Sequence, residues 1–198
     1  MVVLWIVPSD EDASRLQTIM SIKPTSATGS ASFPKFHPHI TLAALPPSST
    51  LTLEQLQEIK KGSLSNDLQI PFKSVNKGDH FFRSVYIAIE LTPALASLHA
   101  RIHSSLDVEP RTPRFPHLSL CYITDEDDAA GEHRTRWKDQ LEALGILRST
   151  ATGDGIELNC SLGGASEFWM SSFTAYEIWF VECIGPVDSW KVLDKVRI

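Results

Sequence analysis

The sequence predicts an α+β fold built from two similar units, each ordered as strand, helix, strand, helix, strand. Two observations predict it. A five-residue phrase occurs twice, as Pro38-His39-Ile40-Thr41-Leu42 and as Pro116-His117-Leu118-Ser119-Leu120. Apolar runs and amphipathic stretches precede both copies in the same order. We therefore expect two lobes whose antiparallel sheets face a central cleft, with helices on the outside.

Hydrophobic periodicity and capping residues define the first unit. The run over residues 2–7 is apolar throughout, which predicts a buried strand, and Ser9 followed by three acidic residues predicts a helix start. Thr52 and Gln55 form a capping box at the start of a second helix. We expect, in order, a strand over 2–7, a helix over 9–22, a loop over 23–36, a strand over 38–45, a helix over 53–61 and a strand over 68–75.

The second unit follows from the same reasoning. Thr92 caps a helix that has Pro93 at its first position, and Gly145 suits the end of another helix. We expect, in order, a turn over 76–79, a strand over 82–90, a helix over 92–106, a loop over 107–114, a strand over 116–122, a helix over 124–144, and strands over 156–162 and 176–184 that can pair as a hairpin. Residues 186–198 form a tail that packs on a sheet edge.

The chain has 198 residues, which is enough to bury one core, and no linker divides it. We therefore expect a single bilobal domain over residues 1–198. Its repeats lie at approximately 1–78 and 82–163, and the C-terminal strands and tail occupy 174–198. Two such units packed about a pseudo-two-fold axis bring both copies of the phrase to one cleft.

The alternation of side chains in a strand gives each phrase a polar face. Side chains two residues apart point the same way, so His39 and Thr41 share one face, and so do His117 and Ser119. The aliphatic residues between and after them anchor the opposite face in a core. A single pair of this kind is usually an ordinary half-buried strand, whereas two copies in matching surroundings favour a site.

Two histidines and two hydroxyls suit the hydrolysis of a phosphodiester. Histidine changes charge near neutrality, so one imidazole can take a proton from water while the other gives a proton to the leaving oxygen. The hydroxyls of Thr41 and Ser119 can bind the non-bridging phosphate oxygens. Such a set needs no metal and no cofactor. Which histidine is the base and which is the acid stays open.

Two arginines lie in the loop before the second phrase, at Arg111 and Arg114. Guanidinium groups bind phosphate oxygens through paired hydrogen bonds. We include Arg114 among the substrate-binding residues, with a solvated surface charge as the alternative.

The repeated His-x-Thr/Ser strands and the duplicated order of elements resemble the 2H phosphoesterase superfamily over essentially the whole chain. Within it, three segments are similar to the small 2′,3′-cyclic-nucleotide 3′-phosphodiesterases of fungi and plants. These segments are Leu4-Trp5-Ile6-Val7-Pro8, Phe81-Phe82-Arg83-Ser84-Val85 and His117-Leu118-Ser119-Leu120-Cys121-Tyr122.

The resemblance implies two reactions. One is hydrolysis of nucleoside 2′,3′-cyclic phosphates to 2′-phosphates. The other is hydrolysis of ADP-ribose 1″,2″-cyclic phosphate, a by-product of tRNA splicing, to ADP-ribose 1″-phosphate. The resemblance also implies an acid/base pair, His39 and His117, and two phosphate clamps, Thr41 and Ser119.

The resemblance further implies that aromatic residues contact the nucleotide, namely Trp5, Phe82 and Tyr122. Trp5 lies in a strand that should be largely core, so a packing role is the alternative. Strict alternation puts Tyr122 on the face opposite His117, and only a twist or the end of the strand returns it to the site.

The composition limits the classes of binding partner and the cellular location that we expect. Acidic residues outnumber basic ones by 24 to 18, which argues against long nucleic acids and allows a small phosphate ester. No apolar run approaches the ~20 residues of a membrane span, and the start lacks the features of a signal peptide. Three widely spaced cysteines give no disulfide framework. We expect a cytoplasmic monomer with reduced thiols and with Cys121 lining the groove on the His117 face.

Three other interpretations remain. A metal site could use His37, His39 and His117, whereas His99 and His103 fit an exposed helix face better than a metal site. An RNA-end enzyme of the same superfamily, a 2′-5′ ligase or a 3′-end phosphodiesterase, is a second alternative. A non-catalytic nucleotide-binding module is the third.

Overall fold

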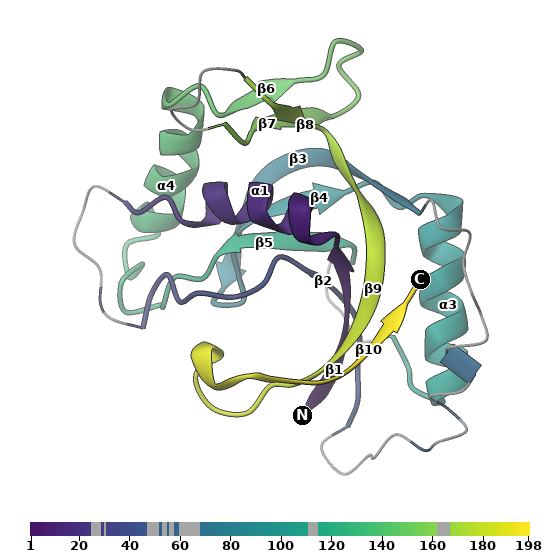
Figure 1. Ribbon diagram of the computed structural model, residues 1–198. Helices are drawn as coiled ribbons and strands as arrows, with labels where there is room; N and C mark the ends of the chain where they lie inside the picture. Colours follow the sequence, from purple (N-terminus) through teal and green to yellow (C-terminus); the bar gives the residue numbers. More distant parts are fainter. Residues whose placement is uncertain are drawn as a thin grey trace.

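The computed structural model describes residues 1–24, 29, 31–46, 52, 55, 58–59, 68–110, 115–161 and 167–198 (Figure 1). Most of the helix predicted over 53–61 and the whole of Arg114 lie outside the described residues. No helix in the described ranges is long and apolar enough to cross a membrane.

The described residues form strands and helices in a mixed order. They are β1 (Val2–Pro8), α1 (Asp10–Met20), β2 (Ile40–Ala44), β3 (Gln69–His80), β4 (Arg83–Ile89), α3 (Pro93–Leu106), β5 (His117–Cys121), α4 (Glu132–Ala143), β6 (Leu147–Ser149), β7 (Ile156–Asn159), β8 (Trp169–Met170), β9 (Ser172–Glu182), a 3₁₀ turn (Val187–Ser189) and β10 (Lys191–Arg197). Every strand pairing in the described residues is antiparallel. The predicted α+β class is confirmed.

The main sheet has the strand order β1-β2-β5-β4-β3-β9-β10. The long strand β9 also pairs with β1, so six of these strands form a closed circuit of hydrogen-bonded neighbours. Strand β10 lies on the outer edge of β9, which agrees with the prediction for the C-terminal tail. Strands β6, β7 and β8 form a separate small sheet. Figure 1 shows β9 curving along one side of the molecule, with α1 across the middle and α3 and α4 on opposite sides.

Capping residues start the first two described helices where the sequence predicts them. The Ser9 hydroxyl accepts a hydrogen bond from the backbone N–H of Asp12, and the Thr92 hydroxyl accepts one from Leu95. The apolar stripe of α1 is buried against β1 and β5, and α3 packs on β2. Both helices therefore cover the outer face of the strands that carry the repeated phrases.

The β3–β4 hairpin is longer than predicted. The sequence places its turn at residues 76–79, but β3 continues to His80 and the chain reverses at residues 81–82. Gly78 permits this, because a Cβ built there would lie 2.1 Å from the carbonyl oxygen of Arg83. The extension carries Asp79 and Arg83 to the end of the hairpin.

Helix α4 begins at Glu132, several residues after the acidic start predicted at residue 124. Of the carboxylates in between, Asp127 binds a distant loop, and Asp128 binds the first turn of α4 from outside the helix. Asp127 accepts hydrogen bonds from the Gly29 backbone at 2.9 Å, and Asp128 accepts one from the backbone N–H of Arg134 at 3.1 Å. The predicted hairpin between the later strands is also wrong, because β7 pairs with β6 and β8 while β9 is occupied by the main sheet.

A β-bulge interrupts the pairing of β1 with β2. Trp5 pairs with Thr41 and Leu4 pairs with Ala43, so Leu42 has no partner on β1. A bulge places two consecutive residues on one face of the sheet. Leu42 and Ala43 accordingly both lie in the core, fully buried.

A second bulge occupies the equivalent position in the other unit. Tyr86 pairs with Ser119 and Val85 pairs with Cys121, so Leu120 has no partner on β4. Leu120 and Cys121 are both core residues. The expectation that Cys121 lines the groove is therefore wrong, because the bulge turns its side chain to the opposite face.

Strands β2 and β5, which carry the two phrases, pair with each other at Ile40 and Leu118. Each is the residue that follows the histidine of its phrase, and both are fully buried. The matching bulges and this central pair support the duplication that the sequence predicts. We propose residues 1–78 and 82–163 as the two structural repeats, related by a pseudo-two-fold axis through this pair.

Candidate active site

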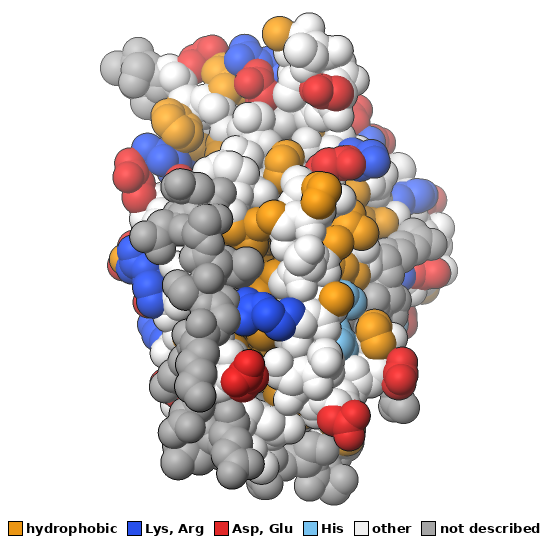
Figure 2. All heavy atoms as spheres, turned by 90° about the vertical axis from the view of Figure 1, so that its right-hand side faces the viewer, with side chains coloured by type: hydrophobic (Ala, Val, Ile, Leu, Met, Phe, Trp, Pro, Cys, Tyr) orange, Lys and Arg blue, Asp and Glu red, His pale blue; other side chains and the backbone are white. Residues whose placement is uncertain are grey.

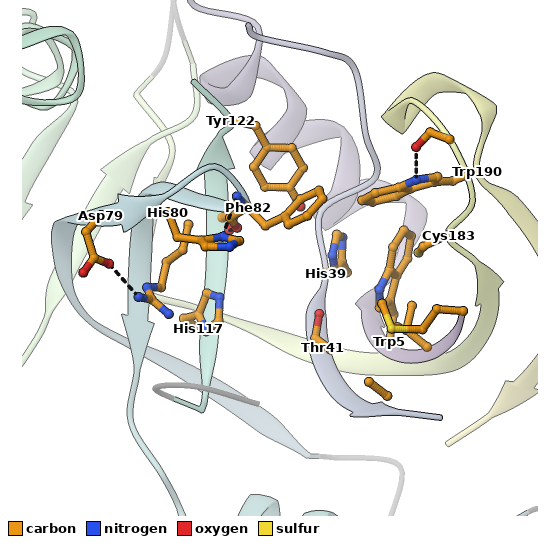
Figure 3. A pocket seen from close by; sticks show the side chains of 16 residues that line it. Trp5, His39, Thr41, Asp79, His80, Phe82, His117, Tyr122, Cys183 and Trp190 are labelled. Carbon is orange, nitrogen blue, oxygen red and sulfur yellow. Dashed lines mark hydrogen bonds and ion pairs between the residues drawn. The ribbon is translucent and has the colours of Figure 1, made fainter. Parts of the chain in front are cut away.

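A cavity of about 640 Å³ opens on the face of the main sheet opposite the helix-covered core (Figure 3). Seven of the eight side chains predicted for the site line it, and the eighth, Arg114, lies outside the described residues. The seven are Trp5, His39, Thr41, Phe82, His117, Ser119 and Tyr122. They come from both units, so residues distant in sequence are gathered in one place.

The register of β2 and β5 explains why the two phrases face each other. When Ile40 pairs with Leu118 in an antiparallel ladder, the preceding residue of one strand lies opposite the following residue of the other. His39 therefore lies toward Ser119, and Thr41 toward His117. Because the paired aliphatic residues point into the core, all four polar side chains point to the cavity.

His39 is held in a buried and well-defined position. Its ring stacks on Trp5, with centroids 3.7 Å apart and planes 13° from parallel, and only 6% of the residue is exposed. The Nδ1 atom lies 2.6 Å from the carbonyl oxygen of His37. Because a carbonyl only accepts, Nδ1 carries a proton, and Nε2 is the basic nitrogen of the neutral ring.

Burial sets the charge of this imidazole. It lowers the pKa of His39 to about 3, and the nearby imidazoles of His37 and His117 add to the effect by repelling a positive ring. The hydrogen bond to the His37 carbonyl opposes the shift but is the smaller influence. At neutral pH the ring is therefore uncharged.

His117 has a different aromatic neighbour. The ring of Tyr86 meets it edge to face, with centroids 5.4 Å apart. Tyr86 pairs with Ser119 just as Trp5 pairs with Thr41, so each histidine has an aromatic residue from the preceding strand of its own unit beside it. His117 is only half-buried, in contrast to His39.

The two hydroxyls also differ. Ser119 Oγ donates a hydrogen bond of 2.7 Å to the carbonyl oxygen of Phe82, which links this hydroxyl to the end of the β3–β4 hairpin. Thr41 is half-buried on the cavity wall. Ser119 must rotate its O–H away from Phe82 before it can donate to a bound oxyanion.

Tyr122 reaches the cavity because of the bulge at Leu120. The bulge shifts the alternation of side chains by one residue. Tyr122 therefore lies on the same face as His117, whereas strict alternation would place it on the opposite face. Its ring stacks on Phe36, with centroids 4.0 Å apart, and meets Phe82 edge-on at 5.5 Å. Burial raises the pKa of the phenol above its ordinary value, so the group is a neutral hydroxyl.

Sequence reasoning missed several side chains that line the cavity. The end of the β3–β4 hairpin supplies Asp79, His80 and Arg83, and the C-terminal segment supplies Cys183 and Trp190. The three hairpin residues were missed because the turn was predicted too early. The sequence did not predict that Trp190 lines the cavity. Its position near β1 depends on the pairing of β9 with both β1 and β10, which joins segments distant in the sequence.

The other histidines lie outside the cavity lining. His37 stacks on Trp179, with centroids 4.3 Å apart. His103 is buried, with Nδ1 3.0 Å from the Val108 carbonyl and Nε2 3.2 Å from the Leu42 carbonyl, so the predicted exposed face is wrong there. His99 stacks on Phe115. Among the residues that the structure describes, no three His, Cys, Asp or Glu side chains are grouped to hold a metal ion.

The chain was compared with known proteins. A cyclic phosphodiesterase of Arabidopsis thaliana is 27% identical over 129 residues, which are 63% of this chain and 67% of that protein. The crystal structure of E. coli LigT complexed with phosphate covers 99% of this chain and 95% of that chain, at 11% identity and a TM-score of 0.49. The family described as cyclic phosphodiesterase-like protein matches residues 1–198. The family match covers every residue, which confirms the resemblance to 2H phosphoesterases and identifies the chain as a phosphodiesterase-type enzyme that belongs to the cyclic phosphodiesterase-like family.

Proposed function

We propose that the protein hydrolyses nucleoside 2′,3′-cyclic phosphates to 2′-phosphates and ADP-ribose 1″,2″-cyclic phosphate to ADP-ribose 1″-phosphate, without a metal. The observation that carries this proposal is the cavity lined by two His-x-Thr/Ser pairs. The second substrate is a by-product of tRNA splicing, so we propose that the enzyme acts after that reaction, as a monomer in the cytoplasm.

Two proton transfers are required when a 2′-phosphate is formed. A water oxygen attacks phosphorus and loses a proton, while the bond from phosphorus to the 3′ oxygen breaks and that oxygen gains a proton. Because burial keeps His39 neutral with Nε2 unprotonated, we assign it the proton of the attacking water. His117 then gives a proton to the leaving oxygen, and the reverse exchange through water restores both rings.

The hydroxyls act on the phosphate itself. Thr41 and Ser119 donate to the non-bridging oxygens, on which negative charge increases as water adds. In the free protein, Ser119 donates to the Phe82 carbonyl instead. Substrate binding therefore exchanges one hydrogen bond for another, which keeps the net cost of recruiting this hydroxyl small.

Product analysis tests the proposal. Purified protein is incubated with 2′,3′-cyclic AMP in the presence of a chelator, and the isomers of AMP are separated by chromatography. We expect 2′-AMP, with kcat reduced by about 10²-fold to 10⁴-fold in His39→Ala and in His117→Ala. His133→Ala on α4, away from the cavity, is the matched control and should retain wild-type kcat.

Four results would contradict the proposal. Formation of 3′-AMP would place the broken bond on the other oxygen. Activity that disappears with chelator would require a metal. Turnover of oligonucleotide ends above that of mononucleotides, or tight binding of the cyclic phosphate with no turnover, would favour the RNA-end enzyme or the binding module instead.

A further inference from the structure

The two ends of the cavity differ in chemistry. In Figure 3, Trp5 and Trp190 lie beside His39, whereas Asp79 and His80 lie on the side of His117. The first end is aromatic, with Trp5 and Trp190 in contact at a centroid distance of 5.9 Å. The second end is polar and is formed by the β3–β4 hairpin, which also contributes Arg83. A substrate that spans the cavity therefore meets a flat apolar surface at one end and a guanidinium at the other.

Arg83 is the strongest anion-binding group at the polar end. Its side chain is 12% exposed, and its Nη2 atom lies 3.0 Å from Asp79 Oδ1. Its Nε atom is buried and has no hydrogen-bond partner among the described residues. That N–H is shielded from the cavity, but a guanidinium has five N–H donors, and its terminal nitrogens in this cavity-lining side chain can donate to a ligand oxygen.

His80 presents a second donor next to Arg83. The backbone N–H of Phe82 lies 3.3 Å from His80 Nδ1 and donates to it. Because Nδ1 accepts, the neutral ring carries its proton on Nε2. The residue is exposed and lines the cavity, so this N–H is available to a ligand.

We propose that Arg83 and His80 bind a phosphate group attached to the 5′ carbon of the ribose that bears the cyclic phosphate. On such a ribose, the base and the 5′ carbon extend from opposite sides of the ring oxygen. With the cyclic phosphate between His39 and His117, a base that stacks on the aromatic end directs the 5′ carbon to the polar end. Paired N–H donors of a guanidinium match phosphate oxygens. This inference rests on the proposed function and specifies its preferred substrates as 5′-phosphorylated cyclic phosphates.

Asp79 should weaken phosphate binding at this site, because its carboxylate forms an ion pair with the guanidinium of Arg83. Its side chain is 81% exposed and carries a negative charge at the position that an incoming phosphate approaches. A phosphate must compete with that carboxylate for Arg83. Removing the charge while keeping the side-chain shape, in Asp79→Asn, should therefore strengthen the preference for a 5′-phosphate.

The test compares kcat/KM for 2′,3′-cyclic AMP with kcat/KM for the same compound bearing a 5′-phosphate. We expect wild type to favour the 5′-phosphorylated compound through a lower KM. The ratio of the two values should fall by about 10-fold to 100-fold in Arg83→Gln, less in Arg83→Lys, and about 3-fold in His80→Ala. It should rise in Asp79→Asn. Thermal denaturation of each variant confirms that it folds.

Other outcomes separate this inference from the proposed function. If Arg83→Gln lowers kcat/KM equally for both compounds, Arg83 acts at the reacting phosphate and the second site is wrong. If wild type hydrolyses both compounds without preference, the second site is wrong and the proposed function stands. If wild type hydrolyses neither, the proposed function is wrong. Calorimetry with adenosine 5′-phosphate then decides the second site, because weaker binding by Arg83→Gln supports it and equal binding overturns it.

Discussion

The buried state of His39 makes the stability of the fold depend on pH. The unfolded imidazole has the ordinary pKa of 6.5, whereas burial lowers the pKa of His39 to about 3 in the folded protein. Between these values the unfolded chain binds a proton that the folded protein does not. Protonation therefore favours unfolding, so stability is highest above pH 6.5 and falls as the pH decreases toward 3.

The size of the effect follows from the two pKa values. Between pH 7.5 and pH 4.5, this one group should reduce the free energy of unfolding by about 2.5 to 3 kcal/mol. The amount depends mainly on the unfolded pKa, because pH 4.5 stays above the pKa of the folded state. It is a large part of the stability of an ordinary domain, which is about 5 to 15 kcal/mol.

Urea denaturation of wild type and of His39→Asn at the two pH values measures this effect. Asparagine keeps an amide donor near the position of Nδ1 and does not ionise. The difference at pH 7.5 records the pH-independent cost of losing the ring that stacks on Trp5. We expect the loss of stability between the two pH values to be about 2.5 to 3 kcal/mol smaller in the variant. Equal losses in the two proteins would refute the reasoning.

Two further predictions concern the pH dependence of kcat/KM and the contribution of His103 to stability. Because His39 stays neutral in the free protein, kcat/KM for 2′,3′-cyclic AMP should not fall as the pH decreases from 7 to 5. An acidic limb centred near pH 6.5 would contradict the proposed role of His39 as base. His103→Leu removes the ring N–H that donates to one of the two neighbouring carbonyls and should cost about 1 to 3 kcal/mol by urea denaturation, whereas the matched variant His99→Leu on the same helix should cost less than about 1 kcal/mol.

The sequence was sufficient for the elements that depend on local pattern. The strand at residues 2–7 and the helices capped by Ser9 and Thr92 follow from periodicity and capping chemistry, and they occur close to their predicted bounds. Elements that depend on distant groups were misjudged. The carboxylates before α4 resemble a helix start, but Asp127 binds Gly29, which lies far away in the sequence.

Two side chains near the second phrase show the limit of alternation. Counting by twos from His117 assigns Cys121 to the groove and Tyr122 to the core, and the structure shows the reverse. The cause is one unpaired residue, Leu120, whose position is set by the register of β4 against β5. Register is a property of two strands together, so the sequence of one strand does not reveal it.

The proposed duplication also accounts for the way in which two similar phrases hold unlike histidines. Each phrase places its histidine beside an aromatic residue from the preceding strand of its own unit. Trp5 covers the ring of His39 face-on, whereas Tyr86 meets His117 only at an edge and leaves it half-buried. The same two-residue spacing therefore gives one imidazole that burial keeps neutral and one that stays open to the cavity. General acid–base catalysis needs this inequality, because two histidines in the same state cannot take a proton and give one in a single step.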